Sequence, residues 1–241
     1  MRKLFLLITT LVLLTAIAEA KDVAYVSKNA ANQDFVDSLN GLGLSYDLLD
    51  SDDLGNVDFS DYEMILVGDD FFNEPLDIPV DKHNSLIVNT RYILDWGLGS
   101  NVNTVGSSQP LEIRNKDTNK FITNGFNEFV RVYTSSTDGS RTLQLYSLDR
   151  TDRISRNVVS IEDIDRDNLG DPAISVNLPG TNLLNGKTSS GRIVFFGITE
   201  SRFWTNEAKE LFKRSIIFTL NGNDADNDGH QNVLVGGSDC N

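Results

Sequence analysis

The chain has 241 residues, of which 35 are acidic and 21 basic, so its formal net charge is -14. Proteins that bind nucleic acid neutralise phosphates with clustered lysine and arginine. This chain has no such cluster, so we do not expect it to bind nucleic acid. Its single cysteine, Cys240, cannot form an internal disulfide; it is free, or it pairs with a cysteine outside this sequence.

The N-terminus has the pattern of a secretory signal peptide. Arg2 and Lys3 precede an apolar run from Leu4 to Ile17, and the small residues of a cleavage site follow at residues 18–20. The apolar run is short for a membrane span, and no comparable run follows it. We therefore expect a signal peptide at residues 1–20, a domain at 21–220 and an acidic segment at 221–241. The mature protein is expected to be secreted or at the cell surface, without a transmembrane segment.

Short apolar runs alternate with a helical pattern in the first part of the mature chain. Residues 22–27 predict a strand, and residues 32–42 predict a helix that ends before Gly43. Further strands are predicted at residues 45–50, 62–67 and 85–89. These runs are apolar without strict alternation, which is typical of strands covered on both faces of a parallel sheet. The order of elements predicts an open α/β sheet with helices on both faces.

The rhythm changes between residues 111 and 178. Short strands separated by Gly, Asp and Ser predict an antiparallel edge or an inserted β-layer, at residues 130–133, 142–147, 158–161 and 173–178. A buried strand at 191–197 and an amphipathic helix at 204–220 then close the domain. The fold class is therefore α/β, a flavodoxin-like open and mostly parallel sheet with an antiparallel β insertion, followed by an Asp-rich C-terminal calcium loop.

The acidic segment has the pattern of a calcium site. Asp224, Asp226 and Asp228 occupy alternate positions and Gly229 follows, so a tight turn can direct their oxygens to one hard cation. His230 stands where such loops use a backbone carbonyl. The twelfth position of an EF-hand loop, normally a bidentate Glu, is Val235, so Asp239 is expected to supply the missing oxygen.

This segment resembles thrombospondin type 3 repeats and related Asp-rich calcium repeats of secreted proteins. Such repeats usually occur in tandem, so the resemblance implies that the chain is the front of a longer protein. The alternative is a solvated acidic tail. A second acidic run, with Asp163, Asp165 and Asp167, could form another calcium loop, but it lacks the following glycine and carries Arg166 between ligands. Its alternative is a charged turn between strands.

The domain resembles class I glutamine amidotransferase-like domains, including the trehalose-utilisation type. The resemblance rests on the sequence GRIVFFG at 191–197 with the helix after it, and on FITNGF at 121–126. The family's activity needs a cysteine after the fourth strand, where this chain reads Asn89-Thr90-Arg91, and a His-x-Glu after the last strand, where it reads Ile198-Thr199-Glu200. The catalytic Cys and His are therefore missing. His83 and His230 lie in polar segments and are interpreted as ordinary surface residues.

Several polar residues follow the predicted parallel strands, and open α/β sheets bind ligands at that edge. The expected ligand rim comprises Asp69, Asp70, Thr90, Arg91 and Glu200. Two functions remain open. The first is a secreted, non-catalytic binding or scaffold module with an unknown protein or glycan partner at the cell surface and a calcium-ordered stalk. The second is an extracytoplasmic hydrolase of a sugar or amide, with two rim carboxylates as acid and base.

Overall fold

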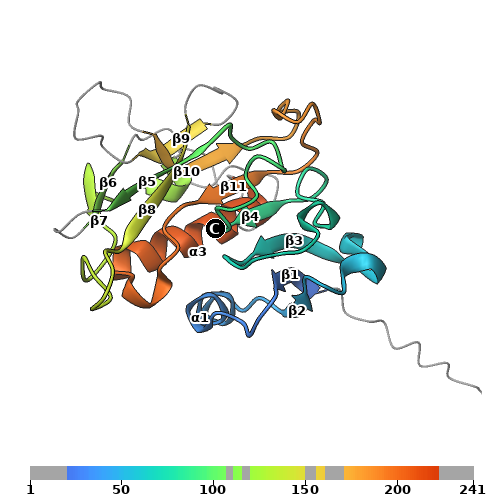
Figure 1. Ribbon diagram of the computed structural model, residues 1–241, viewed down its shortest axis with the longest axis horizontal. Helices are drawn as coiled ribbons and strands as arrows, with labels where there is room; N and C mark the ends of the chain where they lie inside the picture. The colour runs from blue at the N-terminus through green and yellow to red at the C-terminus, as the bar shows by residue number, and fades with distance from the viewer. Residues whose placement is uncertain (1–20, 107–110, 116–119, 150–155, 161–170, 223–241) are drawn as a thin grey trace, which may run out of the picture.

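The computed structural model (Figure 1) describes residues 21–106, 111–115, 120–149, 156–160 and 171–222. Within them, nine strands form one mixed sheet in the order β2-β1-β3-β4-β11-β10-β9-β6-β7, and β5 and β8 form a small antiparallel sheet. The calcium ligands expected at residues 224–239 and the acidic run at 163–167 lie outside the described residues.

The first half of the sheet is parallel and has the strand order of flavodoxin-like folds. Its strands are β2 (Tyr46–Asp50), β1 (Lys21–Ser27), β3 (Tyr62–Val67), β4 (Ser85–Ile87) and β11 (Ile193–Phe196). Side chains on each strand alternate between two apolar layers: Val23 and Tyr25 point to one, and Ala24 and Val26 to the other. Burial on both faces explains why these strands lack polar alternation. The predicted flavodoxin-like α/β class is confirmed.

The second half of the sheet is antiparallel and is built by the insertion between β4 and β11. Its strands are β10 (Pro172–Asn177), β9 (Arg156–Ser160), β6 (Glu112–Asn115) and β7 (Phe129–Arg131). The separate sheet pairs β5 (Val102–Gly106) with β8 (Gln144–Leu148). The antiparallel insertion is confirmed, but β5 and β6 were not predicted, because short polar runs such as VNTVG carry no clear apolar period.

The helices lie on one face of the sheet, so the prediction of helices on both faces was wrong. Helix α1 (Gln33–Gly41), the short α2 (Lys120–Thr123) and α3 (Asn206–Asn221) contribute to one apolar cluster. The opposite face is covered by 3-10 turns and loops that bury isolated large side chains, such as Phe59, Ile78 and Trp96. The connections after β2 and β3 contain Asp, Gly and Pro, which favour turns over an amphipathic helix.

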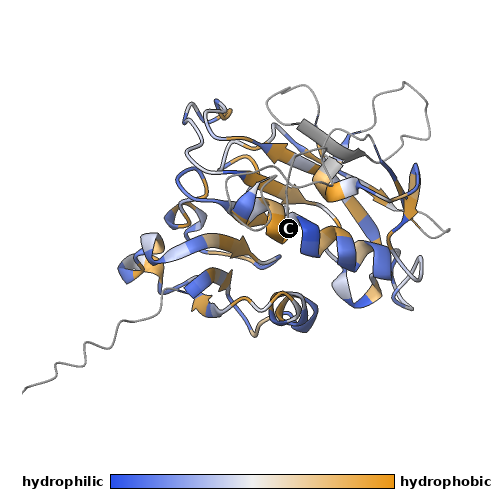
Figure 2. Cartoon of the chain, turned by 180° about the vertical axis from the view of Figure 1, so that it is seen from behind, coloured by the Kyte–Doolittle hydropathy of each residue, from blue (hydrophilic) through white to orange (hydrophobic). Residues whose placement is uncertain are grey.

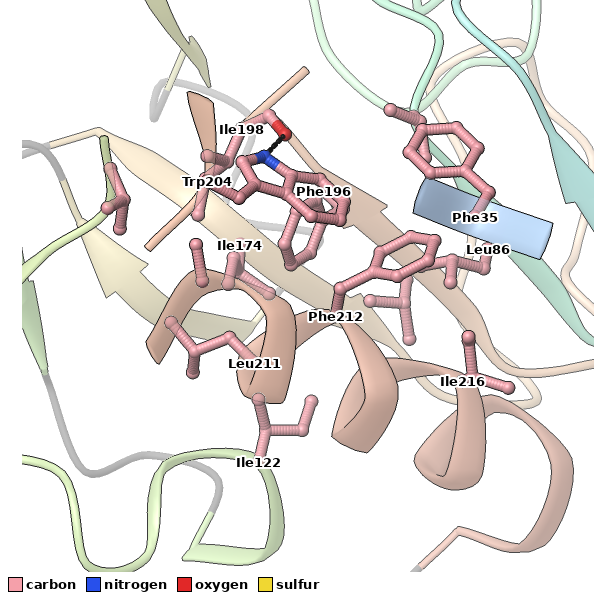
Figure 3. Packing of buried hydrophobic residues seen from close by; sticks show 14 of the residues in the cluster. Phe35, Leu86, Ile122, Ile174, Phe196, Ile198, Trp204, Leu211, Phe212 and Ile216 are labelled. Carbon is pink, nitrogen blue, oxygen red and sulfur yellow. Dashed lines mark hydrogen bonds between the residues drawn. The ribbon is translucent and has the colours of Figure 1, made fainter. Parts of the chain in front are cut away.

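Aromatic rings fill the interface between α1, α3 and β11 (Figure 3). Phe212 of α3 stacks on Phe35 of α1 with ring centroids 4.8 Å apart, and it meets the edge of Phe196 at 5.3 Å. Trp204 packs on Phe212 at 4.9 Å and donates its indole N–H to the carbonyl of Ile198 at 2.9 Å. This cluster anchors the end of β11 and therefore the segment that carries Glu200.

Hydropathy follows these layers: the central strands are largely hydrophobic, whereas α3 shows hydrophilic turns on its outer side (Figure 2). None of the helices in the described part of the chain is both long and apolar enough to cross a bilayer.

Candidate functional site

The carboxyl ends of β1, β3, β4 and β11 meet at one edge of the sheet, because these strands are parallel neighbours. Ligands bind at this edge in open α/β folds, where loops leave the sheet in different directions. Ser27 is the last residue of β1, and the segments that follow β3, β4 and β11 carry Asp69, Arg91 and Glu200. We call the set formed by Asp69, Arg91, Arg141, Tyr146 and Glu200 the rim.

The carboxylate of Asp70 forms hydrogen bonds that hold two loops together. Its carboxylate accepts hydrogen bonds from the hydroxyl of Ser27 at 2.5 Å, the backbone N–H of Lys28 at 3.3 Å and the side-chain amide of Asn29 at 3.1 Å. These bonds tie the loop after β3 to the loop after β1. Asp70 was expected to contact a ligand at the rim, but its hydrogen bonds favour a structural role.

Asn89 joins the loops after β3 and β4. Its fully buried side-chain amide donates to the carbonyls of Gly68 at 3.0 Å and Asp70 at 2.7 Å, and its oxygen accepts from the backbone N–H of Arg91 at 2.9 Å. Within the turn at 89–91, where the resemblance implies a cysteine, the side chain of Asn89 thus has a structural role. Buried amides with three such bonds are rigid supports for the residues beside them.

Asp69 is the most perturbed carboxyl of the rim. Its side chain reaches solvent and accepts a hydrogen bond from the backbone N–H of Thr90. Its pKa is raised mainly by desolvation and further by the charges of Asp70 and Glu200, while Arg91 opposes the shift. The carboxylate of Asp69 is therefore exposed to solvent at one side while neighbouring protein atoms partly desolvate it.

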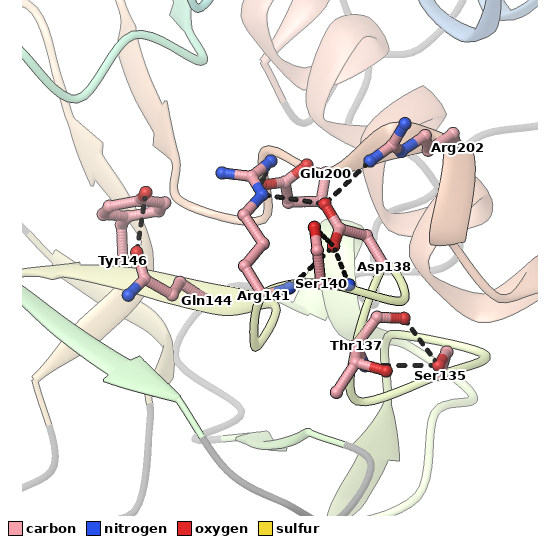
Figure 4. A network of polar contacts seen from close by, with 9 residues as sticks. All are labelled: Ser135, Thr137, Asp138, Ser140, Arg141, Gln144, Tyr146, Glu200 and Arg202. Atoms are coloured by element: carbon pink, nitrogen blue, oxygen red, sulfur yellow. Dashed lines mark hydrogen bonds and ion pairs between the residues drawn. The ribbon is translucent and has the colours of Figure 1, made fainter.

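Glu200 comes from the opposite side, after β11. Its carboxylate forms an ion pair with the guanidinium of Arg141 at 2.6 Å, and 16% of its side chain is exposed (Figure 4). Arg141 also donates to Asp138 at 2.9 Å, and Arg202 reaches the same Asp138 oxygen at 3.1 Å. Backbone and side-chain hydrogen bonds from Arg141, and then from Ser140, lower the pKa of Asp138. This network holds the turn at 135–142 beside Glu200.

Two tyrosines line the same region. Tyr133 donates its hydroxyl to the carbonyl of Gln144 at 3.0 Å and accepts a 3.4 Å bond from the backbone N–H of Glu200. Tyr146 donates to the side-chain oxygen of Gln144 at 3.2 Å. Burial raises the pKa of both phenols, and the nearby charges of Asp69 and Glu200 add to the increase. Both hydroxyls therefore stay protonated at neutral pH and remain donors.

All five expected rim residues lie near one another, since Thr90, Arg91, Asp70 and Glu200 all act on the carboxyl of Asp69. The carboxylate of Asp70, however, is bonded to Ser27 and the loop after β1. Sequence reasoning missed Arg141 and Tyr146, which arrive from the inserted strands. No spacing links Arg141 to Glu200 along the chain, so only the folded insertion reveals the pair. His83 lies before β4, next to the ring of Phe59 at 6.2 Å, and burial lowers its pKa.

Among the described residues, no group of three or more His, Cys, Asp or Glu side chains could hold a metal ion. The rim itself contains Asp69 and Glu200, each opposed by an arginine. Its chemistry is therefore that of paired hydrogen-bond donors and acceptors.

No family model matches the chain, and no curated protein matches it. Among solved structures, it is similar to a ThuA-like protein from Bacteroides uniformis, with a TM-score of 0.54 and 10% identity over 84% of this chain and 92% of that chain. It is also similar to the carbohydrate deacetylase Agd3, with a TM-score of 0.50 and 11% identity over 88% of this chain but 33% of that one.

A glutamine amidotransferase from Thermotoga maritima aligns with a TM-score of 0.46 and 13% identity, over 82% of this chain and 81% of that chain. At such identities only the fold is comparable. The described domain therefore has a flavodoxin-like α/β fold similar to that of the ThuA-like protein.

Proposed function

We propose that this protein is a secreted, non-catalytic module that binds a glycan at the rim. The observation that carries the proposal is the position of two exposed side chains on neighbouring loops: Asp69, an acceptor after β3, and Arg91, a donor after β4, close enough for the charge of Arg91 to act on the carboxylate of Asp69. The name of one fold neighbour, the carbohydrate deacetylase Agd3, is consistent with a carbohydrate ligand.

A sugar hydroxyl fits such a pair because it donates and accepts at once. One hydroxyl can donate to the carboxylate of Asp69 while a neighbouring hydroxyl accepts from the guanidinium of Arg91. Glu200 and Arg141 offer a second acceptor and donor across the rim. The two carboxylates and two guanidiniums balance in charge, which favours a neutral ligand over an ionic one.

A binding role without catalysis is supported by the residues at the two positions that amidotransferase chemistry requires. The turn at 89–91, where the resemblance implies the nucleophilic cysteine, contains none, and its Asn89 side chain is occupied by three structural hydrogen bonds. Ile198 stands where the histidine belongs and is fully buried. Without a thiolate and its base, acyl transfer of that type has no route.

The test is a glycan array followed by calorimetry. The array carries neutral gluco-, manno- and galacto-oligosaccharides of one to six units, with uronic-acid and amino-sugar oligomers as charged comparisons. We expect a neutral glycan to bind to the wild type. Its affinity for Asp69→Asn should be at least tenfold lower, because this substitution removes the charged acceptor. Asp37→Asn, an exposed carboxylate on α1, is the matched control. Absence of binding, or equal binding by Asp69→Asn, would overturn the proposal.

A second candidate is hydrolysis of a glycosidic bond. Asp69, with its raised pKa, could protonate the leaving oxygen, and Glu200, which pairs with Arg141, could activate water on the other side. The atoms balance as water adds across the bond. Product release from the array's bound glycan, lost in both Asp69→Asn and Glu200→Gln, would favour this function. Intact glycan after long incubation would exclude it.

We also propose that calcium at Asp224, Asp226, Asp228 and Asp239, beside His230, orders the acidic segment as a stalk. The support is the alternate spacing of the carboxylates and the glycine after them. Calcium titration of the chain from Lys21 tests it. Saturable binding at up to millimolar calcium, lost in an Asp226→Ala, Asp228→Ala variant, is the expected result. Absence of binding would leave a solvated acidic tail instead.

A further inference from the structure

Phe71 is an exposed aromatic side chain next to the rim. It follows Asp69 and Asp70 in the loop after β3, and 62% of its surface is accessible. Its ring contacts that of Tyr92 at a centroid distance of 6.2 Å and an angle of 58°. Tyr92 in turn follows Arg91. The two loops therefore run beside each other, with the ring of Phe71 against that of Tyr92 and the charge of Arg91 near Asp69.

The backbone under Phe71 is fastened on both sides. On one side, Asp70 is tied to Ser27 and Asn29. On the other, Phe72 is buried, stacks on Tyr92 at 5.6 Å and 17°, and exchanges backbone bonds with the Tyr92 hydroxyl at 2.7 and 2.6 Å. Asn73 then donates to Asp52 at 2.9 Å. The ring is thus presented to solvent on a fixed support, which is the condition for precise recognition.

We infer that Phe71 is a stacking platform for the apolar face of a pyranose, in a second subsite beside Asp69 and Arg91. This inference rests on the proposed function and adds that the ligand is an oligosaccharide of at least two units. One face of a pyranose presents C–H groups, which pack on the electron-rich face of an aromatic ring. A phenyl ring also loses little conformational freedom on binding, because it has only two side-chain torsions.

The spacing supports two units. Phe71 follows Asp69 by two positions, so their Cα atoms lie at most about 7 Å apart. A pyranose presents hydroxyls at its edge and C–H groups on its face, so we assign the hydrogen bonds with Asp69 and Arg91 to one sugar and the stacking on Phe71 to its neighbour. Exposed rings elsewhere differ: Phe129, 46% exposed on the distant edge strand β7, is covered by the guanidinium of Arg114 at 5.8 Å.

The experiment is calorimetry with sugars of one to six units from the cello-, manno- and galacto-oligosaccharide series. Phe71→Ala is expected to bind oligosaccharides about tenfold more weakly than the wild type and to bind the monosaccharides equally well. Phe71→Trp, which keeps the platform, is expected to retain the wild-type affinity, and Phe71→Leu, which keeps only apolar bulk, is expected to lose it. Phe129→Ala is the matched control and is expected to change nothing.

The outcomes separate the two proposals. If the wild type binds a glycan and Asp69→Asn weakens it, but Phe71→Ala binds oligosaccharides like the wild type, the platform is refuted and the proposed function stands. An equal loss for monosaccharides and oligosaccharides also refutes the second subsite. If the wild type binds no member of the three series and no glycan on the array, the proposed function fails, and the platform fails with it.

Discussion

Substitution of Gly197, which directly follows β11, should have a large effect, because the backbone of Tyr146 in β8 lies against it. A Cβ added at this position would lie 2.0 Å from the carbonyl oxygen of Tyr146 and 2.8 Å from its carbonyl carbon. The same contact contains a hydrogen bond of 3.0 Å from the N–H of Tyr146 to the carbonyl of Gly197. Strand β8 can therefore approach β11, and place Tyr146 at the rim, only where no side chain intervenes.

We expect Gly197→Ala to lower the free energy of unfolding by about 3 kcal/mol. Forcing a methyl group against backbone costs about 1–3 kcal/mol, and loss of the hydrogen bond costs about 1 kcal/mol. In a domain of this size each kcal/mol corresponds to about 2–4 °C, so the melting temperature should fall by about 6–12 °C. Calorimetric or circular-dichroism melting of the two proteins measures the difference.

Gly55→Ala is the matched control for this substitution. A Cβ at Gly55 meets nothing within 4 Å, and its backbone does not adopt the left-handed conformation. Its melting temperature should stay within about 2 °C of the wild type, because exposed substitutions usually change stability by less than 0.5 kcal/mol. If Gly197→Ala melts like Gly55→Ala, the close approach of β8 to β11 is refuted.

Three further predictions concern the same fold. Phe212→Ala should lower the free energy of unfolding by about 3–5 kcal/mol in urea titration, because the buried ring packs on Phe35 and Trp204; a loss below 1 kcal/mol would contradict that packing. Ser175→Ala should raise stability by about 1 kcal/mol, since this buried hydroxyl has no hydrogen-bond partner among the described residues; a decrease would show that it has one. The raised pKa of Asp69 means that the native state holds its proton more tightly than the unfolded chain, so ionised Asp69 lowers stability above its native pKa. Asp69→Asn should therefore be more stable than the wild type at neutral pH. This difference in stability should vanish as the pH falls to 3.8, the ordinary pKa of the carboxyl. A variant less stable than the wild type at pH 7 would contradict the raised pKa.

The parallel half of the fold could be predicted from sequence because each strand carries its own signal. The run YEMILV at 62–67 matches β3 residue for residue, and the predicted helix at 32–42 differs from α1 by one residue at each end. Apolar periodicity and capping residues are properties of a short segment, so they can be recognised without knowing what the segment packs against. The segments that cover the other face of the sheet could not be predicted, because turns that bury single residues such as Phe59 have no apolar periodicity.

The candidate site divides in the same way. Asp69, Arg91 and Glu200 were identifiable because they directly follow predicted parallel strands, and the ends of such strands must share an edge. Arg141 and Tyr146 were not identifiable, since the insertion brings them to Glu200 and Gly197 by contacts between distant segments. The different use of two adjacent carboxylates was equally hidden: only the folded loops show Asp70 bonded to Ser27 while Asp69 stays open.

The sequence by itself thus determined the class of fold, the edge where the site lies and the residue types available there, because strand patterning and charge are properties of neighbouring residues. The tertiary structure alone decided which of these groups remain free to meet a ligand. Hydrogen bonds and desolvation depend on what packs around each side chain, and in this protein much of that packing comes from an insertion with little apolar period of its own.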